Sequence, residues 1–155
     1  MYERDEEEVD WRAKGAVTPP KDQGTCGSCW SYGATGTTEG QLFLKTGTLT
    51  PLSQQNLMDC SWPQGNNACD GGLDFRAYEW MMEHDGQIAT EASYPYLNAD
   101  GYCRFSSSQP MAAKISVREC MHIRAGAVNE QKEWMDVHAA VPFSFIHFYS
   151  LITTH

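Results

Sequence analysis

The chain has 155 residues, which is enough for a single domain or for two small lobes with a hydrophobic core. Its formal net charge of −9 argues against a nucleic-acid partner, because such a partner requires a basic face. No apolar run approaches the ~18 residues that a membrane-spanning helix needs.

The N-terminus, residues 1–8, is acidic, and a block of like charges is typical of a solvated tail. It has neither the basic n-region nor the apolar h-region of a signal peptide. The six cysteines nevertheless favour an oxidising compartment, because a cytosolic domain usually carries fewer. We therefore expect that sequence upstream of this chain is missing.

The next segments alternate between breakers and helical patterns. Prolines and glycines predict an extended loop from residue 9 to Gly24. Apolar residues then recur at roughly helical intervals from Cys29 until Gly47, which predicts a helix whose internal glycines allow close packing on a neighbour. Ser53 is an N-cap candidate for a short helix that ends near Cys60.

A glycine-rich and asparagine-rich turn region follows, and then a second amphipathic helix over Leu73 to Glu83, closed by Asp85 and Gly86. The remaining elements are a loop to Pro110, strand-like sequence from Ala113, helix-like sequence over 129–141 and an apolar, β-prone end. The change of pattern near Pro110 predicts a helical lobe at 9–110 and a β-rich lobe at 111–155.

The stretch "KDQGTCGSCWSYGATG" carries the chemistry. Cys29 stands at the predicted start of a helix, where unpaired N–H groups and the macrodipole favour a thiolate. Gln23 has a side-chain NH2 that a turn at Gly24 to Gly27 brings near the Cys29 backbone N–H. Two such donors form an oxyanion hole, so this loop suits a nucleophilic cysteine.

Three other interpretations of the cysteines remain. A redox C-x-x-C pair, Cys26 with Cys29, is expected near a βαβ pattern, which the sequence does not show. A zinc site would take Cys26, Cys29, Cys60 and Cys69, but eight residues separate the last two instead of the usual two to four. A purely structural set of disulfides leaves Gln23 and Trp30 without a role.

The segment "QGTCGSCWS" resembles the active-site loop of papain-family cysteine peptidases, whose motif is C-G-[SA]-C-[WY]. Further segments resemble cathepsin L-like members in the same order: "VDWR", "LSQQNLMDCS", "NNACDGGLDF" and "YPYLNADGYCR". The resemblance covers about residues 9–105. It implies an α+β, papain-like fold, with the helical N-terminal lobe intact and the β-rich C-terminal lobe incomplete.

Carried over residue by residue, the resemblance implies that Cys29 is the nucleophile, Gln23 the oxyanion donor and Trp30 a packing residue behind the nucleophile. It implies disulfides that join Cys26 to Cys69 and Cys60 to Cys103. Cys29 is then free, as a nucleophile must be. Cys120 has no counterpart in the family and is expected to be an unpaired, buried thiol.

The resemblance also implies a substrate groove. Gly71 and Gly72 would offer an open backbone edge to an extended peptide, in the manner of strand addition. Leu73 would form one wall of the main specificity pocket. Asp74 stands where family members often have an apolar residue, which puts a preference for a bulky apolar side chain in doubt.

The implied activity is that of an endopeptidase that hydrolyses peptide bonds through a cysteine thioester. Its partners would be peptide or protein substrates and protein inhibitors, and no cofactor, metal or nucleic acid is expected. The implied location is the lysosome or the outside of the cell.

The sequence departs from the family in one respect. A cysteine peptidase needs an imidazole base held by Asn or Asp, and the family carries this pair at about 130–150 residues after the cysteine, beyond the last residue here. His84, His122, His138 and His147 come too early, and nothing follows His155 to hold it. We therefore expect a C-terminally truncated chain that is inactive by itself. The alternative is a truncated homologue that binds peptides or inhibitors without catalysis.

Overall fold

The computed structural model describes residues 10–106 and 111–114. The helices are α1 (Cys29–Thr46), α2 (Gln54–Cys60) and α3 (Asp74–Glu83), with a short 3₁₀ helix, η1, at Ala68–Asp70. The strands are β1 (Gln87–Ala89) and β2 (Met111–Lys114). Several sequence predictions lie outside the described residues: the acidic tail at 1–8, the boundary at Pro110, the second lobe from residue 115 on, Cys120, His122, His138, His147 and His155.

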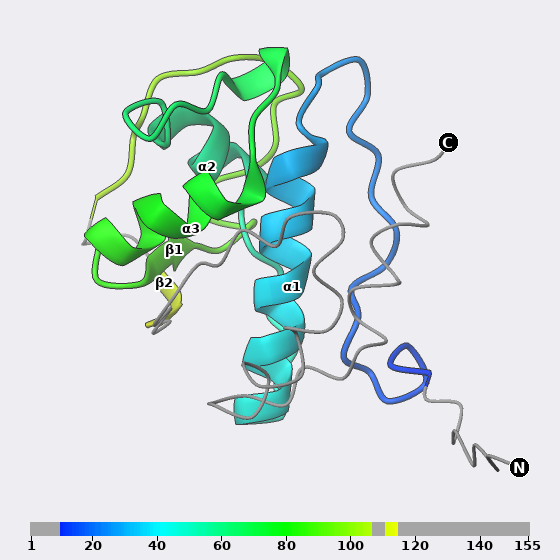
Figure 1. Ribbon diagram of the computed structural model, residues 1–155. Helices are drawn as coiled ribbons and strands as arrows, with labels where there is room; N and C mark the ends of the chain where they lie inside the picture. Colours follow the sequence, from blue (N-terminus) through cyan, green and yellow to red (C-terminus); the bar gives the residue numbers. More distant parts are fainter. Residues whose placement is uncertain (1–9, 107–110, 115–155) are drawn as a thin grey trace, which may run out of the picture.

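The predicted first helix is confirmed as α1, which runs between the N-terminal extended segment and the pair α2 and α3 (Figure 1). It ends at Gly47, whose φ of 73° is left-handed and whose N–H donates to the carbonyl of Phe43 at 2.7 Å. Glycine adopts this conformation without steric cost and satisfies one of the last free carbonyls. The predicted stop is therefore correct.

The predicted second helix is confirmed as α2, and all seven of its residues are buried. The Ser53 side chain caps it by accepting a hydrogen bond from the Asn56 N–H at 2.9 Å. Its polar side chains have partners on several segments: Gln54 donates to Thr35, and Asn56 accepts from the Ala89 N–H. A buried polar helix of this kind is tolerated because its polar groups are paired.

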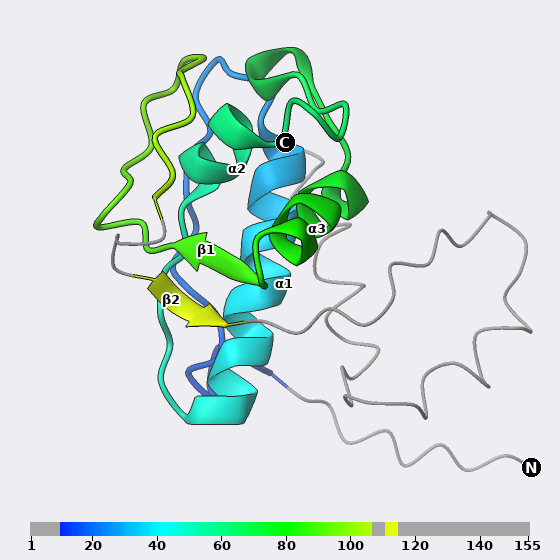
Figure 2. The ribbon, with the colours of Figure 1, turned by 90° about the vertical axis from the view of Figure 1, so that its left-hand side faces the viewer.

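The third helix begins one residue later than predicted, with Leu73 as its N-cap, and it ends at Glu83 as expected. After it, β1 pairs with β2 in an antiparallel ladder that joins Ile88 to Ala113 (Figure 2). Strand β1 was not predicted. Strand β2 begins at Met111, two residues before Ala113, where strand-like sequence was expected to start. No helix in the described ranges is both long and apolar enough to cross a membrane.

A buried carboxylate holds the N-terminal segment to α1. Glu39 is 2% exposed and accepts hydrogen bonds from the Thr18 hydroxyl at 2.8 Å and the Leu52 N–H at 2.8 Å. Lys21 reaches both Glu39, at 3.4 Å, and Glu91, at 3.0 Å. The loop that delivers Gln23 is thereby fixed at its base.

The two carboxylates that share Lys21 make a matched test of this anchor. Glu39→Gln removes a buried charge and should lower the free energy of unfolding by about 2 kcal/mol. Glu91→Gln, at a site that is 37% exposed, should cost less than about 1 kcal/mol. Urea unfolding with the disulfides intact measures both, and equal losses would show that the anchor is not the buried carboxylate.

Candidate active site

Cys29 is the first residue of α1, and it is the free cysteine within the described ranges. Its side chain is exposed, whereas Ser28 before it and Trp30 after it are buried. Among the described residues, no hydrogen bond occupies the Cys29 backbone N–H, as expected for the first turn of a helix. The thiol therefore faces solvent beside an available N–H donor.

The predicted disulfides are present, and they join Cys26 to Cys69 and Cys60 to Cys103. Because three of the four proposed zinc ligands are bonded in this way, the zinc interpretation is wrong for this structure. Cys26 and Cys29 likewise do not form a redox pair here. In the described ranges, no three His, Cys, Asp or Glu side chains gather as a metal-binding group.

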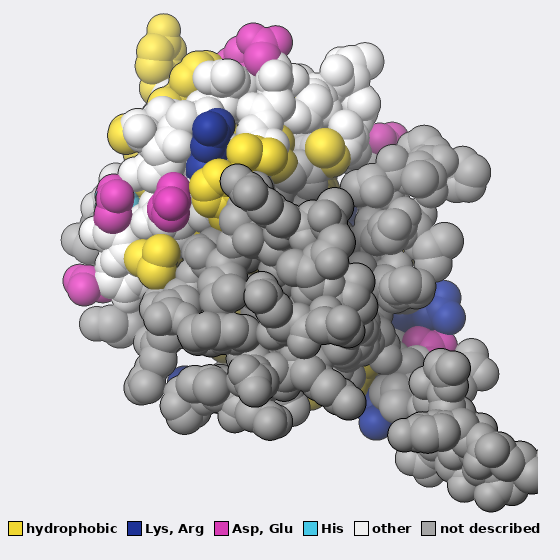
Figure 3. All heavy atoms as spheres, viewed as in Figure 1, with side chains coloured by type: hydrophobic (Ala, Val, Ile, Leu, Met, Phe, Trp, Pro, Cys, Tyr) yellow, Lys and Arg dark blue, Asp and Glu magenta, His cyan; other side chains and the backbone are white. Residues whose placement is uncertain are grey.

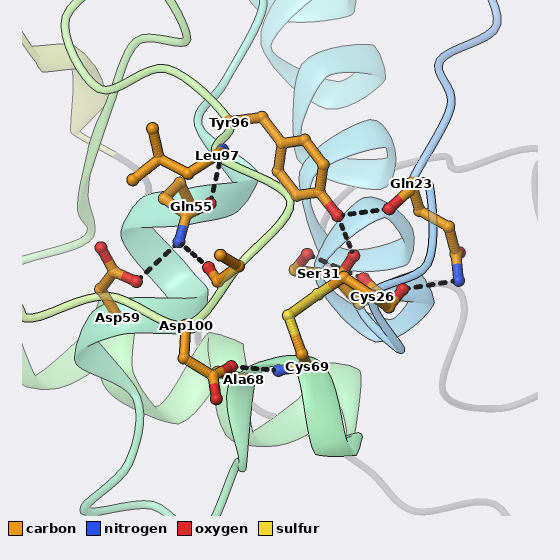
Figure 4. Close-up of a disulfide and its surroundings, with 12 residues drawn as sticks. Gln23, Cys26, Ser31, Gln55, Asp59, Ala68, Cys69, Tyr96, Leu97 and Asp100 are labelled. Atoms are coloured by element: carbon orange, nitrogen blue, oxygen red, sulfur yellow. Dashed lines mark hydrogen bonds between the residues drawn. A yellow bond between two sulfur atoms is a disulfide. The ribbon is translucent and has the colours of Figure 1, made fainter.

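The turn before Cys29 is fastened to the turn around Cys69. Besides the disulfide, the Gly27 N–H donates to the Cys69 carbonyl at 2.8 Å. A Cβ on Gly27 would stand 2.5 Å from that oxygen, so only glycine fits this approach. Figure 4 shows Cys26 and Cys69 bridged next to Gln23.

Trp30, the residue after Cys29, is buried. Its indole Nε1 donates to the Ala68 carbonyl at 3.1 Å, and its ring lies under the backbone of Gly72, where a Cβ would come within 2.7 Å. Gly72 thus lies directly on the residue that follows Cys29. Cys29 and Gly72 therefore belong to one packed unit.

Gln23 lies close to the turn that precedes Cys29. Its Nε2 donates one hydrogen to the Cys26 carbonyl at 2.9 Å, as Figure 4 shows. An amide nitrogen has two hydrogens, so a second donor remains. Gly24 follows with a φ of 64°, a conformation that glycine adopts readily.

Of the predicted groove residues, Gly72 has an open backbone, whereas the Gly71 carbonyl accepts from the Asn67 N–H at 2.8 Å and the Leu73 N–H donates to Asn66 at 2.8 Å. Among the described residues, no hydrogen bond occupies the N–H or the carbonyl of Gly72, and Leu73 is 42% exposed. Asp74 is exposed at the start of α3 and accepts from the Phe75 N–H. Figure 3, viewed as Figure 1, shows several groups of hydrophobic side chains on the described part of the surface, with acidic and basic side chains near them.

His84, the histidine within the described ranges, is held by aromatic contacts. Its ring stacks on Trp80 at 4.3 Å between centroids and meets Phe105 edge-on at 5.4 Å. Its Nδ1 lies 2.7 Å from the Trp80 carbonyl. These contacts pack His84 against two aromatic side chains and the backbone of its own helix.

Sequence reasoning did not find Tyr96. Its hydroxyl donates to the Gln23 carbonyl at 2.7 Å and lies 2.8 Å from the Ser28 hydroxyl. Its ring meets Tyr32 edge-on at 5.4 Å. The segment "YPY" was part of the resemblance, but no spacing rule connects it to a loop about 70 residues earlier.

The comparisons with known proteins agree on one family. The sequence matches the profile of papain family cysteine proteases over residues 6–150. The chain belongs to the papain family of cysteine proteases. It is 55% identical over 105 residues to digestive cysteine proteinase 2 of Homarus americanus and 53% identical over 104 residues to procathepsin L of Rattus norvegicus.

These alignments cover 68% and 67% of the chain but 32% and 31% of the two relatives. A structure of digestive procathepsin L 3 from the larval midgut of Tenebrio molitor is similar, with a TM-score of 0.61 and 53% identity. That likeness covers 65% of this chain and 32% of the other. The papain-family chain thus spans about a third of the length of its cathepsin L-like relatives.

The state of the cysteines gives a direct prediction. Iodoacetamide, without reductant, should modify Cys29 and leave Cys26, Cys69, Cys60 and Cys103 unmodified, because only Cys29 is a free and exposed thiol among them. Peptide mapping before reduction identifies the labelled peptide, and Cys29→Ser serves as the control. Label on Cys26 or Cys69 would contradict the pairing.

Two tyrosines predict how stability depends on pH. Burial, followed by the neighbouring Tyr96 hydroxyl, raises the pKa of Tyr32, and burial with the Asp59 hydrogen bond raises the pKa of Tyr94. The folded chain therefore keeps both protons more tightly than the unfolded chain. The free energy of unfolding should keep this contribution below about pH 10 and lose it as the pH rises further.

Urea unfolding between pH 8 and 11 measures this loss, with Cys29 alkylated beforehand to prevent disulfide exchange. Tyr32→Phe should make the decline above about pH 10 shallower, because it removes one of the two protons concerned. Tyr102→Phe, at a site that is 91% exposed, is the control. A decline that is as steep in Tyr32→Phe as in the control would contradict the assignment.

Proposed function

We propose that this chain carries the nucleophile half of a papain-type cysteine endopeptidase, with Cys29 as the nucleophile. The observation that carries the proposal is the free, exposed Cys29 thiol at the start of α1 in a chain of this family. The unoccupied Cys29 N–H and the second hydrogen of the Gln23 amide support an oxyanion hole next to it.

In the proposed reaction, the Cys29 thiol gives its proton to an imidazole, and its sulfur forms a bond to the carbonyl carbon of a peptide. The carbonyl π electron pair moves to the oxygen, which accepts hydrogen bonds from Gln23 Nε2 and the Cys29 N–H. The C–N bond then breaks as the oxygen reforms the carbonyl, and the imidazolium gives its proton to the leaving amine. Water then hydrolyses the thioester with the same imidazole as base, which restores the thiol and releases the acid.

We propose that the 155 residues by themselves do not complete this cycle. His84 is engaged with Trp80 and Phe105, which supports this proposal. The family spacing of about 130–150 residues from the cysteine to the base also supports it, because that spacing counted from Cys29 exceeds residue 155. The thioester chemistry would then need an imidazole from additional sequence.

We infer that the partner is an extended peptide that binds along Gly71, Gly72 and Leu73. The free N–H and carbonyl of Gly72 support this assignment, because they match the hydrogen bonds of an added strand. The same observation supports the second candidate function, which is binding of peptides or protein inhibitors without turnover. The two disulfides favour a lysosomal or secreted protein.

A fusion tests the nucleophile. The second lobe of a cathepsin L-like relative, with its His and Asn, would follow residue 114, and hydrolysis of a fluorogenic peptide would be measured. The fusion should be active, Cys29→Ala should abolish activity, and Gln23→Ala should lower kcat by about 10²–10³ with little change in KM. The 155-residue chain should show no turnover that depends on Cys29.

Three outcomes would count against the proposal. Turnover of the fusion that survives Cys29→Ala would exclude Cys29 as nucleophile. A fusion that forms both disulfides and binds the peptide but does not cleave it would favour the binding function. Turnover by the unfused chain that needs Cys29 would refute its proposed inactivity.

A further inference from the structure

The Tyr96 hydroxyl joins the two segments that carry the proposed nucleophile and oxyanion donor. It lies 2.7 Å from the Gln23 carbonyl oxygen and 2.8 Å from the Ser28 hydroxyl oxygen. Ser28 is the residue before Cys29. Figure 4 shows Tyr96 reaching from the loop after β1 toward Gln23 and the Cys26–Cys69 disulfide.

The direction of these hydrogen bonds follows from the chemistry of the groups. A carbonyl oxygen only accepts, so the single Tyr96 proton goes to Gln23. The Ser28 hydroxyl must then donate to Tyr96 Oη. Because Ser28 is fully buried, water does not compete for its proton. The order Ser28 to Tyr96 to Gln23 is therefore fixed.

Tyr96 itself is held on both sides. Two residues before it, Tyr94 is buried and donates to Asp59 on α2 at 2.7 Å. One residue after it, the Leu97 N–H donates to Gln55 on α2 at 2.9 Å. These two bonds attach the loop to the buried helix α2. The Tyr96 hydroxyl bond then holds the Gln23 backbone at a fixed place relative to α2.

Gln23 needs such a restraint. Gly24, which follows it, adopts a left-handed φ of 64°. The peptide between the two residues has a hydrogen bond at each end: the Gly24 N–H donates to the exposed Asp22 side chain at 2.8 Å, and the Gln23 carbonyl accepts from Tyr96 at 2.7 Å. Without the Tyr96 bond only the exposed Asp22 contact restrains this peptide, and its rotation would change the direction in which the Gln23 side chain leaves the backbone.

We propose that Tyr96 is a positioning residue that holds the Gln23 amide in place for oxyanion stabilisation at Cys29. The inference rests on the proposed function of Cys29 and Gln23. Tyr96 does not touch the reacting atoms. Its effect is carried through the Gln23 backbone.

The test compares two reactions of Cys29 in the 155-residue chain. With acetyl-Phe-glycinal, the sulfur bonds to the aldehyde carbon, the C=O π bond breaks, and the thiol proton ends on the oxygen through water. With iodoacetamide, the sulfur displaces iodide and the thiol proton goes to water, with no oxyanion formed. Only the first reaction uses the oxyanion donors.

The affinity for the aldehyde is measured as protection of Cys29 from iodoacetamide. The alcohol acetyl-Phe-glycinol, which has no carbonyl, is the control for binding without addition. Tyr96→Phe keeps the ring and removes the hydroxyl. It should lower the affinity for the aldehyde roughly tenfold, while the rate of Cys29 alkylation without aldehyde stays within about twofold of the unsubstituted chain. Peptide mapping first confirms that each variant retains both disulfides.

A double-mutant cycle separates positioning from general destabilisation. Gln23→Ala keeps the backbone carbonyl but removes the donor, so adding Tyr96→Phe to it should have little further effect. Thr38→Val, which removes a buried hydroxyl that donates to the Ala34 carbonyl within α1 at 2.8 Å, is the control and should leave the aldehyde affinity unchanged.

The outcomes distinguish failure of the proposed Cys29 function from failure of the Tyr96 role alone. If the unsubstituted chain gains no more protection from the aldehyde than from the alcohol, the proposed function fails and the role of Tyr96 fails with it. If the aldehyde binds covalently and Tyr96→Phe leaves its affinity unchanged, the role of Tyr96 alone is wrong. Additive effects of Tyr96→Phe and Gln23→Ala would also overturn it.

Discussion

The arrangement depends first on the attachment of the turn before α1 to the turn around Cys69. The Cys26–Cys69 disulfide closes a loop with a sequence separation of 43, which a chain-entropy estimate values at about 4 kcal/mol. The Gly27 hydrogen bond and the Trp30 indole add two contacts within the same small region. A single unit thus positions both Cys29 and the Gly72 edge. In the proposed function, a peptide bound along the Gly72 edge lies next to Cys29.

The interior behind this unit is unusually polar. Glu39, Gln54, Gln55, Asn56 and Asp59 are all buried, and each has a hydrogen-bond partner on another segment. An apolar core tolerates small shifts, whereas a buried polar group loses its partner when a neighbour moves. These buried polar groups therefore hold the loops at 17–24 and 94–99 at fixed positions relative to α1 and α2. The geometry of the candidate site depends on these hydrogen bonds in the core of the lobe.

The sequence predicted those helix ends of this lobe that are determined by residues close by in the chain. Ser53 and Gly47 mark helix ends through bonds to residues three or four positions away, so both ends were found. The disulfide partners came from resemblance, since spacing alone does not choose among pairings. Strand β1 was missed because three residues show no clear period and its partner lies more than 20 positions later. Tyr96 was missed for the same physical reason, because its contacts depend on tertiary placement alone.

The proposed function has two different physical requirements. Stabilising an oxyanion needs fixed N–H donors, and such donors act without reorganisation when the charge appears. Moving protons needs a group that changes its protonation state, and the lobe holds its histidine, His84, against Trp80 and Phe105 instead. Rigid donors are favoured by a packed interior, whereas a proton carrier must lie within hydrogen-bond reach of the nucleophile and of the leaving group. In the proposed function, the lobe supplies the oxyanion donors and the edge for the peptide, and an imidazole from a different part of the fold completes the catalysis.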